Sequence, residues 1–328
     1  MSHRPSAIDH MPLKIKTQNM QNNEDTNILL TGGSGFFGKY LKAELAKTGN
    51  VTTIGISDSD DVFFDLSSGV PELKKRFEFV VHAAGKAHVI PRNKEEIESF
   101  YNINYKGTVN LLRAFDTQGT YPEKFVFMST VAVYGLESGE GIKETAMLKA
   151  VDPYGKSKVM AEKALQEWGE KNNVIVTILR LPLLIGRNAP GNLGAMISAI
   201  KKGRFAIIGK GNTKRSMVFA GDVAAFIPQI AKTGGIYNLT DGHHPTYKEL
   251  AETIGRKLNK RPYFIIPAVV ATLMAKTADI MQKVLHKDLP FSSRRLKKLT
   301  SSLTFDDSKA RKNGWKSGKV TDIVHEWL

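Results

Sequence analysis

The stretch that decides the fold is NILLTGGSGFFGKYLKAELAK, residues 27–47, near the beginning of the chain. Its first five residues form an apolar run typical of a buried strand, and residues 39–47 have the apolar spacing of a helix. The glycines between them allow a tight turn, and the first turn of the helix presents free N–H groups to an anion. A glycine-rich segment between a strand and a helix indicates a loop that binds the diphosphate of a dinucleotide.

The same alternation continues through the N-terminal half of the chain. Short apolar runs at residues 51–56, 79–83, 125–129 and 174–179 are separated by longer segments with helical spacing. This order predicts a parallel sheet that is covered by helices on both faces. We therefore predict an α/β protein with a Rossmann-like doubly wound parallel sheet and a smaller C-terminal substrate-binding lobe.

The sequence divides into three expected parts. Residues 1–26 are polar and lack the apolar stretch of a signal peptide, so we expect a flexible N-terminal extension, in which Met11 or Met20 is an alternative start. Residues 27–181 are expected to form the dinucleotide-binding domain. Residues 182–328, where glycine and proline interrupt the alternation, are expected to form mainly the substrate-binding lobe, interleaved with the last elements of the Rossmann domain.

The composition excludes several classes of protein. The 328 residues contain no cysteine, so disulfide scaffolds, thiolate nucleophiles and cysteine-ligated metal sites are excluded. The histidines, including His82 and His88, do not form a convincing ligand set, and we expect no metal. This composition fits a cytoplasmic enzyme, and a position at the inner face of the membrane stays open.

The positive charge is concentrated near the C-terminus. The net charge is +15, and residues 256–319 carry 16 basic against 4 acidic side chains. This excess favours an anionic partner, which is a phosphorylated substrate, a lipid surface or nucleic acid. The most hydrophobic run, residues 264–285, is interrupted by Lys276, Asp279 and Lys283 well short of the length that spans a membrane. We expect an ordinary packed helix there, with an interfacial membrane helix as the alternative.

Two side chains suited to proton transfer lie in the middle of the chain. Tyr154 and Lys158 are four residues apart, so both lie on one face of a predicted helix. A nearby ammonium group and a positively charged nicotinamide lower the pKa of a phenol, which suits Tyr154 to move a proton while a hydride moves at carbon. The preceding strand ends at Ser129 and Thr130, whose hydroxyl groups are candidates to orient the reacting oxygen.

The end of the second predicted strand bears on the choice of cofactor. An acid at this place holds the adenosine ribose in dinucleotide-binding proteins. Here the strand ends in Gly55-Ile56-Ser57-Asp58, with an apolar residue near the expected acid. Asp58 is the candidate for the ribose, and no arginine follows closely to bind a 2′-phosphate. We therefore predict NAD as the cofactor and leave NADP open.

Together these motifs resemble the extended short-chain dehydrogenase/reductases, specifically the sugar-nucleotide epimerases, dehydratases and 4-ketoreductases, from Asn27 to Gly318. The resemblance implies that Tyr154, Lys158 and Thr130 are catalytic. It implies substrate contacts from four residues, Asn192, Leu193, Arg215 and Arg294, with Arg295 as the alternative to Arg294. It implies cofactor contacts from the glycine loop, the strand ends and the catalytic helix: Gly32, Gly35, Phe36, Phe37, Gly38, Ser57, Asp58, Asp65, Leu66, Ala83, Ala84, Gly85, Lys86, Asn104, Ser129, Tyr154, Lys158 and Pro182.

The function that this resemblance implies is NAD(P)-dependent oxidoreduction at C4 of a nucleotide-linked hexose in surface polysaccharide biosynthesis. A UDP-(N-acetyl)hexose 4-epimerase is favoured. The alternatives are a 4-ketoreductase that makes a UDP-6-deoxy-N-acetylhexosamine and an epimerase of a polyprenyl-diphosphate-linked sugar. A dehydratase is disfavoured, because Val131 and Ala132 stand where its acidic pair is expected. A non-catalytic nucleotide-fold protein that binds nucleic acid or membrane through its basic lobe is disfavoured by the intact catalytic residues.

The expected partners follow from the same resemblance. They are a nucleotide-sugar substrate and, from the habit of the family, a second copy of the chain paired through helices that include Tyr154. No nucleic acid is expected. Peripheral membrane association, through residues 264–285 and the basic stretch after them, stays open.

Overall fold

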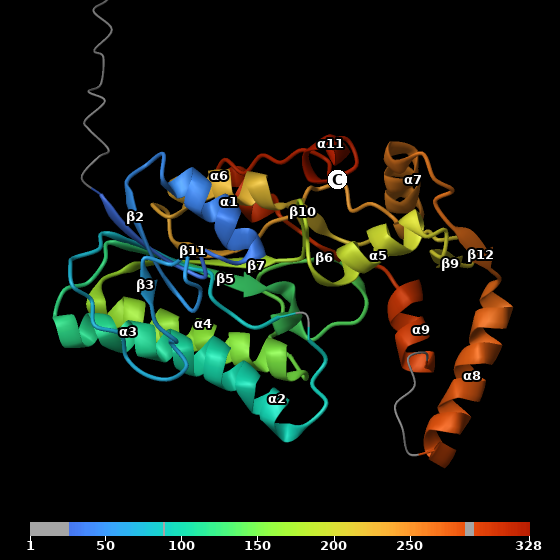
Figure 1. The fold of residues 1–328 in the computed structure, drawn as a ribbon, viewed down its shortest axis with the longest axis horizontal. Coiled ribbons are helices and arrows are strands. Elements are labelled where there is room, and N and C mark those ends of the chain that lie inside the picture. The colour runs from blue at the N-terminus through green and yellow to red at the C-terminus, as the bar shows by residue number, and fades with distance from the viewer. Residues whose placement is uncertain (1–25, 88, 286–291) are drawn as a thin grey trace, which may run out of the picture.

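The computed structural model describes residues 26–87, 89–285 and 292–328 of the chain. The expected extension at residues 1–26 therefore lies outside the described residues, apart from Thr26. A central sheet of seven parallel strands forms the core, in the order β3-β2-β1-β4-β5-β7-β11 (Figure 1). The strand order runs outward in both directions from the β1/β4 pair, which is the doubly wound arrangement. The predicted α/β fold class is confirmed.

The strands of this sheet come from both halves of the chain. Their bounds are β1 Asn27–Thr31, β2 Asn50–Gly55, β3 Val62–Phe63, β4 Phe79–His82, β5 Lys124–Thr130, β7 Ile175–Leu181 and β11 Gly235–Asn238. β11 pairs with β7 although more than fifty residues separate them in the sequence. The sheet is thus completed by a strand from the segment in which the sequence alternation loosens.

Helices cover both faces of the sheet, as the continuous apolar strands require. α1 (Phe36–Leu45) and α6 (Ala220–Ile230) lie on one face, and α3 (Gly107–Gln118) and α4 (Pro153–Asn172) lie on the other (Figure 1). Successive residues of a strand point to opposite faces. Ile28 accordingly packs into the core beneath α1 and α6, whereas Leu29 packs into the core beneath α3 and α4.

One of the covering helices is extended and irregular. α2 (Lys94–Phe100) continues through a π-helical turn, Tyr101–Lys106, directly into α3. The side chain of Asn93 caps α2 by accepting a hydrogen bond from the backbone N–H of Glu96 at 2.8 Å. The π-helical turn lies at the end of the molecule that also carries the carboxyl ends of the central strands.

The remaining elements form a second layer beside the sheet. Their bounds are β6 Gly139–Ile142, β8 Leu183–Ile185, α5 Gly191–Lys201, β9 Ala206–Ile208, β10 Met217–Phe219, α7 Tyr247–Leu258, β12 Phe264–Ile266, α8 Ala268–Leu285, α9 Ser293–Thr300, β13 Leu303–Phe305, α10 Ser308–Lys312 and α11 Val324–Trp327. Three parallel pairs, β10 with β8, β12 with β9 and β13 with β6, tie this layer together.

The expectation of an ordinary packed helix at residues 264–285 is wrong. The first residues form β12, and the helix that follows, α8, projects from the body of the protein (Figure 1). Among the side chains of α8 that the structure describes, residues 268–282, only the small residues Ala271 and Ala275 are buried, whereas Val269 is 82% exposed and Leu273 is 65% exposed. Periodicity indicates a helix, but it does not show what lies against each face. No helix among the described residues is long and apolar enough to cross a bilayer.

Candidate functional site

The glycine-rich loop joins β1 to α1 at the carboxyl edge of the sheet. Gly32 has a φ of +73°, and a Cβ atom there would lie 2.7 Å from the backbone nitrogen of Ala84. The backbone N–H of Ala84 in turn donates to the hydroxyl of Thr31 at 3.1 Å. Gly35 stands at the N-cap of α1, and no side chain caps the helix. The first N–H groups of α1 are thus available to an anion, so this loop fits a dinucleotide diphosphate.

Asp60, a second acid of the turn that contains Asp58, is bonded to this loop. Asp60 accepts hydrogen bonds from the backbone N–H of Ser57 at 3.1 Å and from the hydroxyl of Ser34 at 3.4 Å. Asp58 lies at the exposed tip of the same turn, and Ile56 is also exposed. The three-residue spacing from Ser57 to Asp60, typical of a turn closed by a side chain, is the signal that sequence reasoning missed.

Asp65 and Leu66, expected to contact the adenine, have structural partners in the described protein. The Asp65 carboxylate accepts from the backbone N–H of Ser67 at 2.8 Å, which closes a turn. Leu66 is buried, and its carbonyl oxygen accepts from the side-chain amide of Asn110 at 2.7 Å. These contacts hold the segment against α3, and they leave its adenine contact a prediction.

The end of β4 is tied to two helices through Asn104, which lies in the π-helical turn. The Asn104 side chain accepts from the backbone N–H of Lys86 at 2.7 Å and donates to the Lys86 carbonyl oxygen and to the Ser157 hydroxyl, both at 3.0 Å. A Cβ atom at Gly85 would lie 3.2 Å from Nζ of Lys158. The predicted residues Ala83 to Lys86 and Asn104 are therefore brought together beside the catalytic helix.

Tyr154 and Lys158 lie in the first two turns of α4, and Thr130 is the last residue of β5. Asp152 starts the helix by accepting from the backbone N–H of Gly155 at 3.0 Å. Tyr154 is hydrogen-bonded to Thr130. The structure thus brings the three predicted catalytic side chains to one place, with the phenol and the threonine hydroxyl in direct contact.

The electrostatics of this trio differ from the sequence expectation. Burial raises the pKa of Tyr154, and the hydrogen bond with Thr130 opposes that rise. Nζ of Lys158 donates to the carbonyl oxygen of Met128 at 2.9 Å and lies 4.6 Å from the centre of the Phe127 ring. Burial lowers the pKa of Lys158 to about 8. The expected lowering of the Tyr154 pKa by Lys158 is not found, because the ammonium group is directed to the β5 backbone.

A buried ion pair joins α4 to β7. Glu162 and Arg180 are almost fully buried and are joined at 2.7 Å between Oε2 and Nη2. Arg180 also donates to the Tyr134 hydroxyl at 3.2 Å, and that hydroxyl donates to Asn238 at 2.8 Å. Ser129, predicted to contact the cofactor, donates its hydroxyl to Glu162. Sequence analysis did not find this network, which joins residues far apart in the chain.

A cavity of about 550 Å³ opens in front of Tyr154. Its lining includes Phe100 and Asp152 on one side and residues of α8 and α9, among them Asp279, Arg295 and Lys298, on the other. The side chain of Arg294 is not among those that the structure describes. Arg295, the alternative, lines the cavity.

The other predicted substrate residues differ in their surroundings. The Arg215 guanidinium donates through Nη2 to the Lys298 carbonyl oxygen and lies 5.9 Å from the Tyr247 ring. Its Nη1 is buried, and no described residue accepts a hydrogen bond from it. Such an orphaned cationic donor fits an anionic ligand. Leu193 is instead buried in the core beneath α5, and Asn192 is exposed outside the lining of the cavity.

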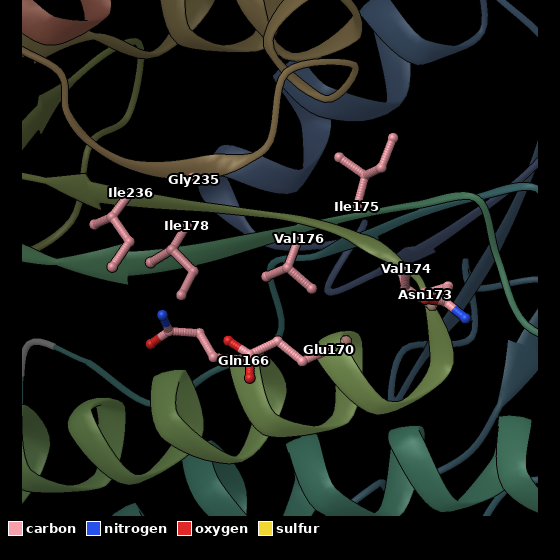
Figure 2. A pocket seen from close by; sticks show the side chains of 10 residues that line it. Gln166, Glu170, Asn173, Val174, Ile175, Val176, Ile178, Gly235 and Ile236 are labelled. Carbon is pink, nitrogen blue, oxygen red and sulfur yellow. The ribbon is translucent and has the colours of Figure 1, made fainter.

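A second hollow lies at the opposite end of α4. This groove has a volume of about 410 Å³. Figure 2 shows Gln166 and Glu170 of α4 facing Val176 and Ile178 of β7. Gln166 is twelve residues from Tyr154, which is roughly 18 Å along a helix. The groove is thus separate from the candidate site. Within the described ranges, no cluster of three His, Asp or Glu side chains could hold a metal ion.

Comparisons with known proteins agree with this geometry. The chain is 28% identical over 302 residues, 88% of its length and 90% of the relative's, to the N-acetyl-alpha-D-glucosaminyl-diphospho-ditrans,octacis-undecaprenol 4-epimerase of Escherichia coli O157:H7. The structure of the UDP-N-acetylglucosamine 4-epimerase from Bacillus cereus matches with a TM-score of 0.68 at 20% identity, over 92% of this chain and 94% of that one. The UDP-glucose 4-epimerase of Thermotoga maritima matches with a TM-score of 0.67 at 22% identity, over 89% and 94%.

A family model also matches more than half of the chain. The model described as the NAD dependent epimerase/dehydratase family covers residues 28–240. This range contains the glycine loop, Thr130, Tyr154, Lys158 and Arg215. The chain therefore belongs to the NAD dependent epimerase/dehydratase family and is an NAD(P)-dependent enzyme.

Proposed function

We propose that the protein is a 4-epimerase of a hexose carried on a diphosphate. The observation that carries the proposal is the position of Tyr154, hydrogen-bonded to Thr130 and facing a cavity whose far wall carries Arg295 and Lys298. A sugar whose C4 reaches the phenol extends its diphosphate toward this basic wall. The 4-epimerase activity in the names of the E. coli, B. cereus and T. maritima relatives supports the same reaction.

The residues at the carboxyl edge of the sheet suit a nicotinamide dinucleotide. The loop from Gly32 to Gly38 and the open N-terminus of α1 would hold its diphosphate, and Ala83 to Lys86 would line its path toward Lys158. When bound, this cofactor supplies the acceptor and the donor for the hydride at C4. The proposed roles of Phe36, Phe37, Pro182, Ser129 and the other cofactor residues rest on the family resemblance.

The proton chemistry belongs to Tyr154. The phenol, once ionised, accepts the proton of the C4 hydroxyl and returns it after the sugar has presented its other face. Thr130 donates toward the reacting oxygen and holds it beside the phenol. Lys158 lies one turn further along α4, and its proposed role of favouring the ionised phenol rests on the family resemblance. Thr130 and Lys158 are buried, and Tyr154 is partly buried in the wall of the cavity.

The substrate-binding residues are proposed to come from the segment 182–328. Arg215 has a buried guanidinium nitrogen without an acceptor among the described residues, and we assign it to the diphosphate. Arg295 and Lys298 line the cavity in front of Tyr154, and Arg294 stands beside Arg295 in α9. Asn192 stays a proposal based on the family resemblance, and Leu193 would act only through its place in the core.

The test combines the fate of the cofactor with the fate of the sugar. Native and denaturing mass spectrometry of the purified protein is expected to show retained NAD, since an epimerase never needs to release it. Incubation with a diphosphate-linked N-acetylglucosamine is expected to produce the C4 epimer without net consumption of NAD(P)H, as followed by NMR. Tyr154→Phe is expected to abolish conversion, whereas Tyr121→Phe, a tyrosine packed on Trp168 outside the site, leaves it intact. Stoichiometric consumption of NAD(P)H would instead identify a 4-ketoreductase.

We further propose that two copies of the chain pair through the face formed by α2, α3 and α4. The exposed apolar side chains Ile97 of α2 and Met160 of α4 support this surface. Light scattering on the purified protein is expected to give twice the chain mass. Met160→Glu is expected to shift the mass to that of one chain, and Met147→Glu, exposed on a loop, is the matched control.

We also propose that the enzyme works in the cytoplasm at the inner face of the membrane. The exposed apolar side chains of α8 and the basic side chains of α9 support peripheral association. Flotation with anionic liposomes at physiological salt is the test. Protein that stays at the bottom of the gradient contradicts the proposal.

A further inference from the structure

His82, the last residue of β4, is a buried side chain with a hydrogen-bond partner at each ring nitrogen. Nδ1 lies 2.6 Å from the hydroxyl of Thr31 at the end of β1, and Nε2 lies 2.9 Å from the hydroxyl of Thr108 in α3. Each of the three residues is at most 1% exposed. Buried polar groups are satisfied by one another, so the direction of each hydrogen bond matters.

The direction follows from the other partner of Thr108. Its hydroxyl donates its single hydrogen to the carbonyl oxygen of Asn104 at 2.7 Å, so toward His82 it acts as an acceptor. Nε2 of His82 therefore carries a hydrogen. Burial lowers the pKa of His82 to about 3, which keeps the ring neutral, and Nδ1 consequently accepts from the Thr31 hydroxyl.

The hydrogen bonds continue from Thr31 to the segment that follows β4. The Thr31 hydroxyl oxygen accepts from the backbone N–H of Ala84 at 3.1 Å. A Cβ atom at Gly32 would lie 2.7 Å from that same nitrogen, so the glycine-rich loop and this segment are in direct contact. The donors all point in one direction along a chain of five residues: Ala84, Thr31, His82, Thr108 and Asn104.

The two ends of this chain lie in two parts of the proposed cofactor site. Ala84 belongs to residues 83–86, which would line the path of the dinucleotide. At the other end, the Asn104 side chain is bonded to the backbone of Lys86 and to the hydroxyl of Ser157 in α4. One imidazole thus connects the glycine-rich loop, the end of β4 and the turn that contacts the catalytic helix.

Aromatic packing fixes the plane of the imidazole ring. His82 stacks on Phe127 of β5 with ring centres 5.5 Å apart and 30° between the planes, and the Phe125 ring packs against it at 6.2 Å. The same Phe127 ring lies 4.6 Å from Nζ of Lys158. Packing on its faces and hydrogen bonds at both nitrogens together lock the orientation of His82.

We propose that His82 is a positioning residue for the cofactor, which in its Nε2–H form holds the glycine-rich loop against the end of β4. The loop is then ordered during folding and not at binding, and a site that is ordered beforehand binds its ligand more tightly. The inference rests on the proposed place of the dinucleotide at this edge of the sheet. It holds for any hexose, because the sugar does not enter the argument.

The position of the ring hydrogen is the first test. Nitrogen NMR of full-length protein labelled at histidine distinguishes the two neutral forms of the ring, and the signal that His82→Gln removes belongs to His82. We expect the hydrogen on Nε2. Thr108→Val removes the acceptor for this hydrogen and is expected to move part of the population to Nδ1. A hydrogen on Nδ1 in the parent protein reverses the chain and overturns the inference.

Fluorescence titration with NADH is the second test, and it needs no turnover. We expect His82→Leu, which has neither donor nor acceptor, to weaken NADH binding about tenfold, and His82→Gln, which has both, to stay within about threefold of the parent protein. Thr108→Val is expected to weaken binding about fivefold. Thr177→Val, the same change at a buried threonine of β7 whose hydroxyl donates to the Ile230 carbonyl oxygen, is the matched control and is expected to bind like the parent.

Thermal unfolding identifies the variants that are folded. Thr108→Val changes the shape of its side chain least and decides the question if His82→Leu does not fold. A folded Thr108→Val variant that binds NADH like the parent overturns the inference, as does a His82→Gln variant that binds as weakly as His82→Leu. A parent protein that binds neither NADH nor NADPH overturns the dinucleotide site and the inference with it. The expected binding differences in a protein that epimerises no sugar support the inference and contradict the proposed function alone.

Discussion

The carboxylate of Asp60 accepts a hydrogen bond from the hydroxyl of Ser34, a residue of the glycine-rich loop, at 3.4 Å. An acid near this loop binds the adenosine ribose in dinucleotide-binding proteins, so we propose Asp60 as a candidate for that role. Asp60 reaches it from a turn three residues beyond Ser57, whose backbone N–H it also accepts. The turn thus provides an acid near the loop, Asp60, although position 56 is an isoleucine.

Asp60→Asn is expected to weaken NADH binding about tenfold, because a charge-assisted hydrogen bond is worth roughly 1.5–3 kcal/mol and part of it is retained by the amide. Binding of NADPH is expected to change less or to improve, since the carboxylate repels a 2′-phosphate. Fluorescence titration with both nucleotides measures the two dissociation constants. Asp58→Asn is the matched control at an exposed position of the same turn. A larger effect of Asp58→Asn would restore the sequence-based prediction.

Lys158→Met is expected to lower the rate of epimerisation about 100-fold or more, in the range of proton-transfer residues. The fold is expected to be at least as stable at pH 7. Burial lowers the pKa of Lys158 from 10.5 to about 8, so at pH 7 the folded protein keeps a charged group that the unfolded chain solvates better. This unfavourable contribution is present below pH 8 and disappears as the pH rises to 10.5. Thermal unfolding at pH 7 and pH 9.5 measures it, and a large drop in Tm of the variant at pH 7 contradicts the prediction.

His82→Gln is expected to reduce the loss of stability in acid. The imidazole of His82 is buried between the hydroxyls of Thr31 and Thr108, at 2.6 Å and 2.9 Å, and burial lowers its pKa to about 3. In the unfolded chain the imidazole is protonated near pH 6.5. The stability that the neutral His82 contributes to the folded protein is therefore complete above pH 6.5 and is lost as the pH falls toward 3. Between these pH values His82 lowers the free energy of unfolding by up to about 1.4 kcal/mol for each unit by which the pH falls.

Urea unfolding between pH 7.5 and pH 4.5 measures this slope. His325→Gln, at an exposed histidine, is the control and is expected to keep the parent slope. An identical pH dependence for His82→Gln and the parent protein would mean that His82 titrates normally in the folded state.

Glu162→Gln is expected to lower the free energy of unfolding by about 3–5 kcal/mol, because it leaves the charge of Arg180 buried without its carboxylate. The double variant Glu162→Leu with Arg180→Met is expected to recover most of this loss, since no buried charge remains. Equilibrium denaturation in urea checks both. A single variant as stable as the parent would show that the remaining partners of Arg180, the Tyr134 hydroxyl and the Glu144 carbonyl oxygen, suffice.

Local patterns in the sequence were enough for much of the fold and for placing Tyr154 and Lys158 on one helix, whereas their catalytic roles stay a prediction. The run from Asn27 to Lys47 contains its own strand, turn and helix, and Tyr154 and Lys158 need only one helix to share a face. The position of Asp60 depends on how a turn closes, and the partners of Glu162 depend on strands from elsewhere in the chain. The exposure of Val269 depends on what fails to pack against α8. Such contacts are long-range, and periodicity contains no information about them.

The contacts of Tyr134 with Phe305 and Asn238 bear on when the chain can fold during its synthesis. The Tyr134 ring stacks on Phe305 at 5.6 Å, and its hydroxyl bonds to Asn238, 104 residues later in the chain. α6, which covers one face of the sheet, is also encoded after all of its central strands. A nascent chain that has reached Leu181 therefore exposes that apolar face and lacks the support of its catalytic loop. The contacts that complete the layer around Tyr134 therefore form only after residues near the C-terminus have been synthesised.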